Sequence, residues 1–213
     1  MDSFPAFVPL AGARVVIVGE GREADEKAAL FIGAPCELAR FPADAAALGP
    51  ELYDRASLVF IGDCDTVFAE AARSAARAAG AMLVNCIDRP ALCDFYTPAI
   101  VDRGAVVGAV GTTGQAPGLA RRLKAEIDAR WPAGLSRLAA LVAAMKADAR
   151  AALPDFAERR DFLESLLEGP AAEAALAGDL DRAVELAGAA LAVHPSPLVG
   201  EGGAHGVEDD MGR

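Results

Sequence analysis

A glycine-rich turn after the first apolar run contains the residue types that could bind a phosphate. Apolar residues 15–18 lead directly into Gly19-Glu20-Gly21-Arg22-Glu23-Ala24. In a dinucleotide-binding turn the first glycine permits a tight bend, the second lets the backbone approach a pyrophosphate, and a small third residue lets the next helix pack on the strand. Gly19, Gly21 and Ala24 stand at these positions. The segment therefore predicts a dinucleotide site, and the alternative is a strand-turn-helix joint without a ligand.

The helix expected after this turn strengthens the prediction, because the amides and dipole at a helix start favour an anionic phosphate. We therefore include Arg22 and Glu23, which open the helix, among the candidate cofactor-binding residues. Arg40 ends the second predicted strand, where many NAD enzymes carry an acid for the ribose hydroxyls. An arginine there can instead accept the extra phosphate of NADP.

Asp88 is the candidate for proton transfer. It lies just past the carboxyl end of a strand predicted at residues 81–86 and two residues before Pro90. Ligands bind at that end of the strands in open parallel sheets, and a carboxylate there can accept a proton. From the residues alone, an Asx-type turn before Pro90 is the alternative.

Alternating strands and helices are needed to hold these residues in place. Apolar patterns predict strands at residues 15–18, 36–41, 57–61 and 81–86, with helices at 23–32 and 66–79. This alternation predicts an α/β fold with a Rossmann-like parallel sheet and crossover helices. Residues 42–53 are alanine-rich and turn-like, so we expect the sheet to lack the strand that usually follows the second one. A further strand is expected at 105–110.

A helical region should follow the sheet, because residues 118–192 are rich in Ala and Leu and carry only a few helix-breaking pairs. These pairs are Trp131-Pro132, Leu153-Pro154 and Gly169-Pro170. Apolar residues in 138–145 and 162–176 exceed what we expect a small bundle to bury, which predicts a homodimer. The predicted organisation is an NAD-binding Rossmann-like domain at 1–110, a helical dimerisation domain at 111–194 and a disordered tail at 195–213.

Charge and composition argue against several classes of protein. The 213 residues carry a net charge of −11, which argues against nucleic-acid binding. We see no secretion signal and no apolar run long enough to span a bilayer, so we expect a cytoplasmic protein that binds no membrane. His194 and His205 lie at and within the tail, so we expect no histidine in the chemistry. Four cysteines without CxxC pairing are interpreted as small buried apolar residues, not metal ligands: Cys36, Cys64, Cys86 and Cys93.

Several segments in this order resemble the precorrin-2 dehydrogenase family, which includes the amino-terminal half of siroheme synthase. The resemblance begins at Phe4-Pro5-Ala6-Phe7 with Leu10, and continues through residues 16–28. It covers most of residues 2–124 and, more diffusely, the helices after them, while we expect no counterpart of the methyltransferase half of the fused synthases. The other matching segments are residues 84–90, Cys93 with Phe95, residues 98–104 and residues 114–121.

The resemblance implies an NAD-dependent oxidation of precorrin-2 to sirohydrochlorin in a homodimer, with Asp88 at the family's catalytic position. It also suggests that Asp63, which follows the strand at 57–61, approaches the cofactor, although it can instead cap the next helix. Some relatives also insert ferrous iron into the product, so a bifunctional enzyme is one alternative. A diverged member that acts as a binding or regulatory subunit is another, because Glu20 and Glu26 add negative charge near the pyrophosphate and one strand is missing.

The tetrapyrrole substrate of this family carries many carboxylates, which calls for cationic and hydrogen-bonding side chains. Arg103 and Arg121 are the candidate cations, and each has a solvated or surface-paired role as its alternative. Thr112, Thr113 and Gln115 occupy a loop before a predicted helix, where they can bind substrate carboxylates or cap that helix.

Overall fold

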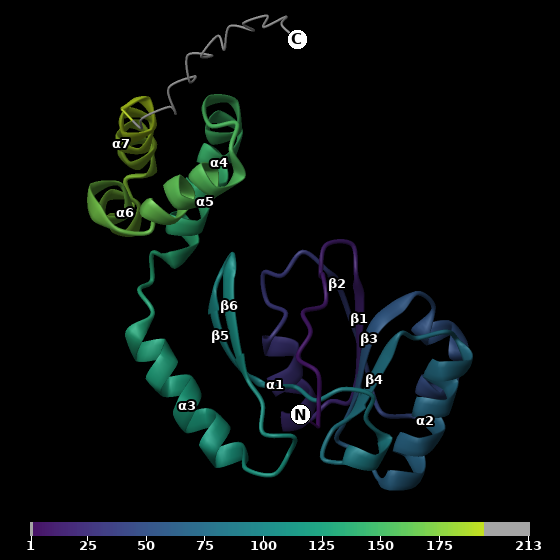
Figure 1. The fold of residues 1–213 in the computed structure, drawn as a ribbon. Coiled ribbons are helices and arrows are strands. Elements are labelled where there is room, and N and C mark those ends of the chain that lie inside the picture. Colours follow the sequence, from purple (N-terminus) through teal and green to yellow (C-terminus); the bar gives the residue numbers. More distant parts are fainter. Residues whose placement is uncertain (1, 194–213) are drawn as a thin grey trace, which may run out of the picture. The chain divides into compact units, whose positions relative to one another are not determined.

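Four parallel strands form the sheet that carries the glycine turn (Figure 1). The structure is a computed structural model that describes residues 2–193. Among these, residues 2–100 and 109–126 form one compact unit, and residues 101–108 and 127–193 form a second. The tail predicted at 195–213 and both histidines lie outside the described residues. The domain limits predicted from the sequence stay predictions.

The first unit follows the predicted alternation of strands and helices. Its sheet has the order β2-β1-β3-β4, with all neighbours parallel. The elements are β1 (Arg14–Val18), α1 (Arg22–Ala29), β2 (Glu37–Phe41), β3 (Ala56–Ile61), α2 (Thr66–Ala78) and β4 (Leu83–Cys86).

The strands end in register, which decides where the candidate residues lie. Val18 is paired with both Phe41 and Ile61, and Ile61 is paired with Cys86. Because these strands are parallel, the turns that follow β1, β2, β3 and β4 all leave the same edge of the sheet. The glycine turn, the end of β2, the turn at Asp63 and the turn at Asp88 therefore share that edge.

Both faces of the sheet are covered, so its central strands β1 and β3 are almost continuously apolar. Val16, Val18 and Val59 belong to the core that contains the buried alanines of α2. Val15, Ile17 and Phe60 alternate with them and belong to the core on the other face, with Ala24 and Phe31. Alanine side chains on α2 bring that helix close to the strands, and Figure 1 shows α1 and α2 on opposite sides of the sheet. The predicted Rossmann-like fold is confirmed.

The connection from β2 to β3 contains two short 3-10 helices, at Ala45–Leu48 and Pro50–Tyr53, and no strand. The buried Tyr53 hydroxyl donates a hydrogen bond of 2.5 Å to the Ala47 carbonyl, and burial raises the pKa of Tyr53 to about 12. This bond fixes a compact connection in the place of a crossover strand. The predicted absence of that strand is confirmed.

A hairpin of β5 (Ala99–Arg103) and β6 (Val106–Val110) follows a short 3-10 helix, η3 (Pro90–Leu92). The sequence predicted β6 but not β5, because Pro98 and the polar Asp102 and Arg103 obscure the apolar pattern. Gly104 makes the turn with φ 71°, and its N–H donates to the Asp102 carboxylate at 2.7 Å. After the hairpin comes α3 (Pro117–Arg130).

The second unit contains four helices around an apolar core: α4 (Leu135–Ala152), α5 (Phe156–Ser165), α6 (Gly169–Ala177) and α7 (Leu180–Ala192). Leu141, Met145, Phe162 and Leu166 are buried inside this unit. The prediction that the apolar residues of 138–145 and 162–176 exceed what the bundle can bury is therefore wrong for these four side chains. They fill the unit's own core because the four helices pack together. Within the described part of the chain, no helix is both long and apolar enough to cross a bilayer.

Candidate functional site

The glycine turn brings three elements so close together that its first residue has no room for a side chain. Gly19 has φ 137°, and a Cβ added to it would lie 2.8 Å from the Gly62 carbonyl oxygen and 3.2 Å from the Ala24 Cβ. The fully buried Ala24 begins the packing of α1 on the sheet. Gly19 and Ala24 thus have the packing roles that the motif predicts, and the turn leaves the start of α1 open to an anion.

Asp63 supplies such an anion from within the chain. Its Oδ2 accepts hydrogen bonds from the N–H groups of Gly21 and Ala24, both at 2.9 Å, and its Oδ1 accepts one from Glu23 N–H at 3.3 Å. The Glu23 carboxylate accepts the Asp63 N–H at 2.8 Å in return. The alternative that Asp63 caps the next helix is wrong, because Asp65 caps α2 by accepting from Phe68 N–H. Asp63 instead covers the start of α1.

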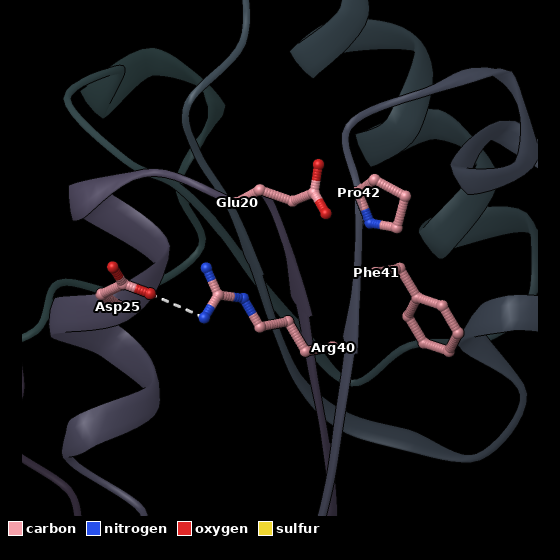
Figure 2. A pocket seen from close by; sticks show the side chains of 5 residues that line it. All are labelled: Glu20, Asp25, Arg40, Phe41 and Pro42. Carbon is pink, nitrogen blue, oxygen red and sulfur yellow. Dashed lines mark hydrogen bonds and ion pairs between the residues drawn. The ribbon is translucent and has the colours of Figure 1, made fainter.

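Arg40 at the end of β2 is held by the same turn. Its Nε donates to the Gly19 carbonyl at 3.0 Å, and its Nη1 pairs with the Asp25 carboxylate of α1 at 2.6 Å. Figure 2 shows this pair beside the Glu20 carboxylate. The three charged residues line a pocket of about 410 Å³ together with Phe41 and Pro42. The pocket therefore has one cation and two carboxylates, and the cation is already paired.

Arg22 and Glu26 neutralise one another on the exposed side of α1, with Nη1 and Oε1 3.8 Å apart. We expected the Glu26 charge to oppose a pyrophosphate. Its proximity to Arg22, one helical turn away, reduces that effect. Arg22 is the first residue of α1, but its guanidinium is paired with Glu26 and is not a free cation for a ligand.

Asp88 stands in the turn after β4 with an exposed carboxylate, for which residues 2–193 provide no hydrogen-bond or ion-pair partner. An Asx-type turn would need an N–H two residues later, which Pro90 lacks. Instead, Arg89 holds the turn: its N–H donates to the Cys86 carbonyl at 3.0 Å, and its guanidinium donates to Thr66 at 3.3 Å and to the Cys64 carbonyl. Backbone and arginine bonds leave the Asp88 carboxylate available.

Lys27 is a residue near this turn that the sequence analysis did not select. It is half-buried on α1, and its Nζ lies 5.8 Å from the centre of the Phe60 ring. Burial lowers the pKa of Lys27, although the charges of Glu26, Asp88 and Cys93 act in the opposite direction. A half-buried ammonium group close enough to Asp88 to feel its charge can exchange a proton more readily than a surface lysine. In the sequence, Lys27 could be noticed only because it follows Glu23 by four residues, which places both on the same face of the predicted helix.

The loop before α3 is held mainly by its own bonds. Thr112 Oγ1 accepts from Ala116 N–H at 3.3 Å, and Thr113 Oγ1 donates to the Thr112 carbonyl at 2.8 Å. Gln115 Nε2 donates to Thr113 Oγ1 at 3.1 Å. Thr112 therefore matches the capping alternative, while an exposed Arg121 on α3 has no ion-pair partner among the residues described.

Arg103 forms an ion pair and hydrogen bonds within the second unit. Its Nη2 pairs with the Asp128 carboxylate at 2.8 Å and also donates to the main-chain carbonyls of Asp128 at 3.1 Å and Trp131 at 3.4 Å. Asp88 is in the first unit. The structure thus gives Arg103 a role in holding β5 to the end of α3, and its predicted role in substrate binding stays a prediction.

The four cysteines form no disulfide with one another, since all are free. Burial raises the pKa of Cys86 to about 11 and also raises those of Cys64 and Cys93. Such thiols stay protonated near neutral pH and are poor nucleophiles. No group of three or more potential ligand side chains in residues 2–193 is arranged to hold a metal ion.

Backbone strain coincides with the candidate residues. Positive φ angles in non-glycine residues are uncommon, and the described chain has them at Arg55, Asp63, Asp88 and Thr113. Three of these four residues had been selected from the sequence for their chemistry. Such conformations concentrate at functional sites.

Comparison with protein families gives matches to both units. Residues 6–99 match a family described as putative NAD(P)-binding, and residues 134–191 match the sirohaem synthase dimerisation region. The first match contains the glycine turn, Asp63 and Asp88, and the second spans most of the helical unit.

Relatives in sequence include the siroheme synthase of Methylococcus capsulatus, 37% identical over 195 residues, which is 84% of this chain and 41% of the relative. The siroheme synthase of Azotobacter vinelandii is 36% identical over 217 residues, 94% of this chain and 47% of the relative. The chain thus spans less than half the length of these relatives. Among solved structures, SirC, precorrin-2 dehydrogenase, has a TM-score of 0.60 at 13% identity, and the match covers 88% of this chain and 100% of that one. At that identity the likeness shows the fold alone.

Proposed function

Because the chain belongs to the family that contains precorrin-2 dehydrogenase and the amino-terminal part of siroheme synthase, we propose that it oxidises precorrin-2 to sirohydrochlorin with NAD. The observation that carries this proposal is the exposed, unpaired carboxylate of Asp88 at the sheet edge that also bears the glycine turn. An acceptor for a proton and a cradle for a dinucleotide are the two parts that such a dehydrogenation requires.

The residues present fit a dinucleotide at the glycine turn. Three amides at the start of α1 hold a carboxylate, and a pyrophosphate oxygen makes the same demands on N–H donors. The fit requires Asp63 to leave these amides. When bound there, a nicotinamide cofactor supplies the hydride acceptor.

Asp88 then acts as the proton acceptor. Dehydrogenation removes a hydride and a proton from the macrocycle, and the Asp88 carboxylate takes the proton because no other side chain among residues 2–193 forms a hydrogen bond or ion pair with it. The positive φ of 57° and the Arg89 bonds keep the carboxylate projecting from the turn. Arg121 and the loop at Thr113 and Gln115, which lie in the same unit as Asp88, are the proposed contacts for substrate carboxylates.

We assign NAD rather than NADP as the cofactor on the charges of the Arg40 pocket. Arg40 already donates to Asp25 and Gly19, so its capacity to bind an extra phosphate is reduced. The Glu20 and Asp25 carboxylates would repel that phosphate, whereas ribose hydroxyls can donate hydrogen bonds to them. The helical unit is assigned to a homodimer, supported by the match of residues 134–191 to the dimerisation region. Light scattering at micromolar concentration tests that assignment, and a monomer would contradict it.

Anaerobic incubation with precorrin-2 tests the reaction directly. With NAD we expect the tetrapyrrole absorbance to change together with the absorbance of reduced nicotinamide, and we expect a much slower change with NADP. Samples without chain or without nucleotide are the controls. If neither nucleotide supports the change, the enzyme assignment is wrong and a binding or regulatory role becomes the better explanation.

Insertion of ferrous iron is a second activity that the unpaired Asp88 carboxylate favours. Iron entry displaces protons from the macrocycle nitrogens, and an available carboxylate can accept them. Incubation of the chain with sirohydrochlorin and ferrous iron, without nucleotide, tests this step separately. A rate equal to that without protein would contradict it.

A further inference from the structure

The amides that should bind the cofactor are already occupied by a side chain of the protein. Asp63 accepts hydrogen bonds from Gly21, Glu23 and Ala24 at distances from 2.9 to 3.3 Å. A carboxylate and a phosphate present the same kind of acceptor, two or more oxygens that share a negative charge. Each N–H group points in one direction, so the two anions compete for the same donors.

We propose that Asp63 is an internal competitor of the cofactor, which lowers the affinity of the glycine turn for pyrophosphate-containing nucleotides. The inference rests on the proposed dinucleotide site. It implies that Asp63 lowers cofactor affinity, where the sequence suggested that Asp63 raises it. The contacts indicate that cofactor affinity rises when Asp63 is removed.

The first amides of α1 are capped in a different way from those of α2. Helix α1 begins after Gly21, which forms no side-chain cap, and its first amides are covered from a loop 40 residues further along the chain. Helix α2, by contrast, is capped by the residue directly before it, Asp65. The ordinary solution of a local cap is thus available in this protein but is not used at α1.

Three features hold Asp63 over the amides. Its backbone adopts φ 51°, and its N–H donates to the Glu23 carboxylate at 2.8 Å. Gly21 lacks a side chain, and a Cβ built there would overlap the Asp63 carboxylate. Gly21 is therefore needed for the approach of Asp63 as well as for the approach of a pyrophosphate, and both anions use the same space.

Binding then requires Asp63 to swing out. Asp63 is exposed, so its carboxylate can turn toward water without crossing the core. The apparent dissociation constant equals the intrinsic one divided by the fraction of molecules in which the amides are open. Since hydrogen bonds to a charged group contribute more than neutral ones, we expect the closed contact to weaken binding about tenfold.

Calorimetry on the full chain tests the proposal with NAD and inorganic pyrophosphate as separate ligands. We expect Asp63→Ala to bind both about tenfold more tightly than the unchanged chain. Asp63→Asn keeps the shape, loses the charge and should show a smaller increase, which covers the case in which the alanine variant folds poorly. Asp65→Ala removes a cap from α2 and should leave both affinities unchanged.

The two ligands separate this inference from the proposed function. If pyrophosphate binds more tightly to the Asp63 variants while NAD binds to none of the proteins, the competitor role stands and the dinucleotide site is wrong. If pyrophosphate binds equally well or less well to both folded variants than to the unchanged chain, Asp63 does not compete and the inference is overturned. Circular dichroism of each variant confirms that it is folded.

Discussion

Two aspartates at the same edge of the sheet show how a shared residue type receives different roles. Asp63 and Asp88 both follow a parallel strand, both have positive φ angles, 51° and 57°, and both are exposed. Asp63 accepts three backbone hydrogen bonds from α1, whereas the described residues offer none to the Asp88 carboxylate. The environment thus ties the Asp63 carboxylate to backbone amides and leaves the Asp88 carboxylate available for the proton transfer that we propose.

The largest expected effect is that of an Asp88 substitution on the rate of dehydrogenation. Asp88→Asn should lower kcat for dehydrogenation by about 10²–10⁴-fold, because it removes a proton acceptor. Asparagine tolerates the positive φ, and the Asp88 carboxylate forms no bond with residues 2–193 that the variant would lose, so thermal stability and NAD affinity should stay unchanged. Steady-state kinetics, calorimetry and thermal melting measure the three quantities. Near-normal turnover would show that Asp88 is only a turn residue and that it is not the proton acceptor.

Gly21→Val should displace the Asp63 carboxylate from the amides of α1 and leave the turn at Asp88 intact. A side chain at Gly21 would overlap the Asp63 carboxylate and fill the space for a pyrophosphate. We expect NAD affinity to fall by at least about 100-fold by calorimetry, since close backbone approach is the purpose of this glycine. Gly188→Ala is the control, because a Cβ there meets nothing within 4 Å. Unchanged affinity in Gly21→Val would refute the site assignment.

Asp94 adds a third, more buried carboxylate to the comparison. It accepts from Val84 N–H at 2.8 Å and pairs with Arg77 at 2.5 Å and Arg73 at 3.2 Å. Burial raises the pKa of Asp94, but the Val84 bond and both arginines outweigh it, so the pKa is lowered. A lowered pKa stabilises the folded state above the unfolded value of about 4, and this stability is lost as the pH falls through the folded pKa.

We therefore expect Asp94→Asn to lower the free energy of unfolding by about 1–3 kcal/mol at neutral pH. The variant should also lose less stability than the unchanged chain as the pH falls below about 4. Urea denaturation at several pH values measures both effects. An equal acid dependence in the two proteins would show that Asp94 does not carry this stabilisation.

Asp25 extends the comparison to a carboxylate paired with a cation. Asp25→Asn removes one charge from the pocket and frees Arg40, so the affinity for NADP relative to NAD should rise about tenfold. Arg40→Ala should change NAD affinity by less than about twofold. Calorimetry with both nucleotides tests this. Selective loss of NADP binding in Arg40→Ala, starting from an unchanged chain that prefers NADP, would overturn the NAD assignment.

The smallest expected effect is a difference in the free energy of unfolding between the Asp63 and Asp88 variants. Asp63→Asn should lower the free energy of unfolding by about 1 kcal/mol, because it removes the negative charge at the start of α1 and one of the two oxygens that accept hydrogen bonds there. Asp88→Asn should change it by less than about 0.5 kcal/mol, as for an ordinary surface substitution. Urea denaturation at neutral pH provides both values. Equal losses in the two variants would mean that the hydrogen bonds of Asp63 do not distinguish it from Asp88.

The amino-acid sequence by itself determined the elements and the places where chemistry could occur. Alternating apolar runs and helical patterns predicted the parallel sheet, the absent strand before β3 and the glycine turn at Gly19. Asp88 could be selected because it follows the end of a strand. These features depend on residues close together in the chain, whose periodicity and turn chemistry are visible locally.

Only the tertiary structure decided which groups the charged residues contact. Asp63 covers amides 40 residues away in the chain, Arg40 is tied to α1, and Arg103 is bound to Asp128. The same holds for Leu141, Met145 and Phe162, which fill the core of the helical unit where the sequence suggested side chains left over for a second subunit. Local patterns specify a strand, a turn or a helix, but the partner of a side chain depends on which distant elements pack beside it, and that is fixed only when the whole chain has folded.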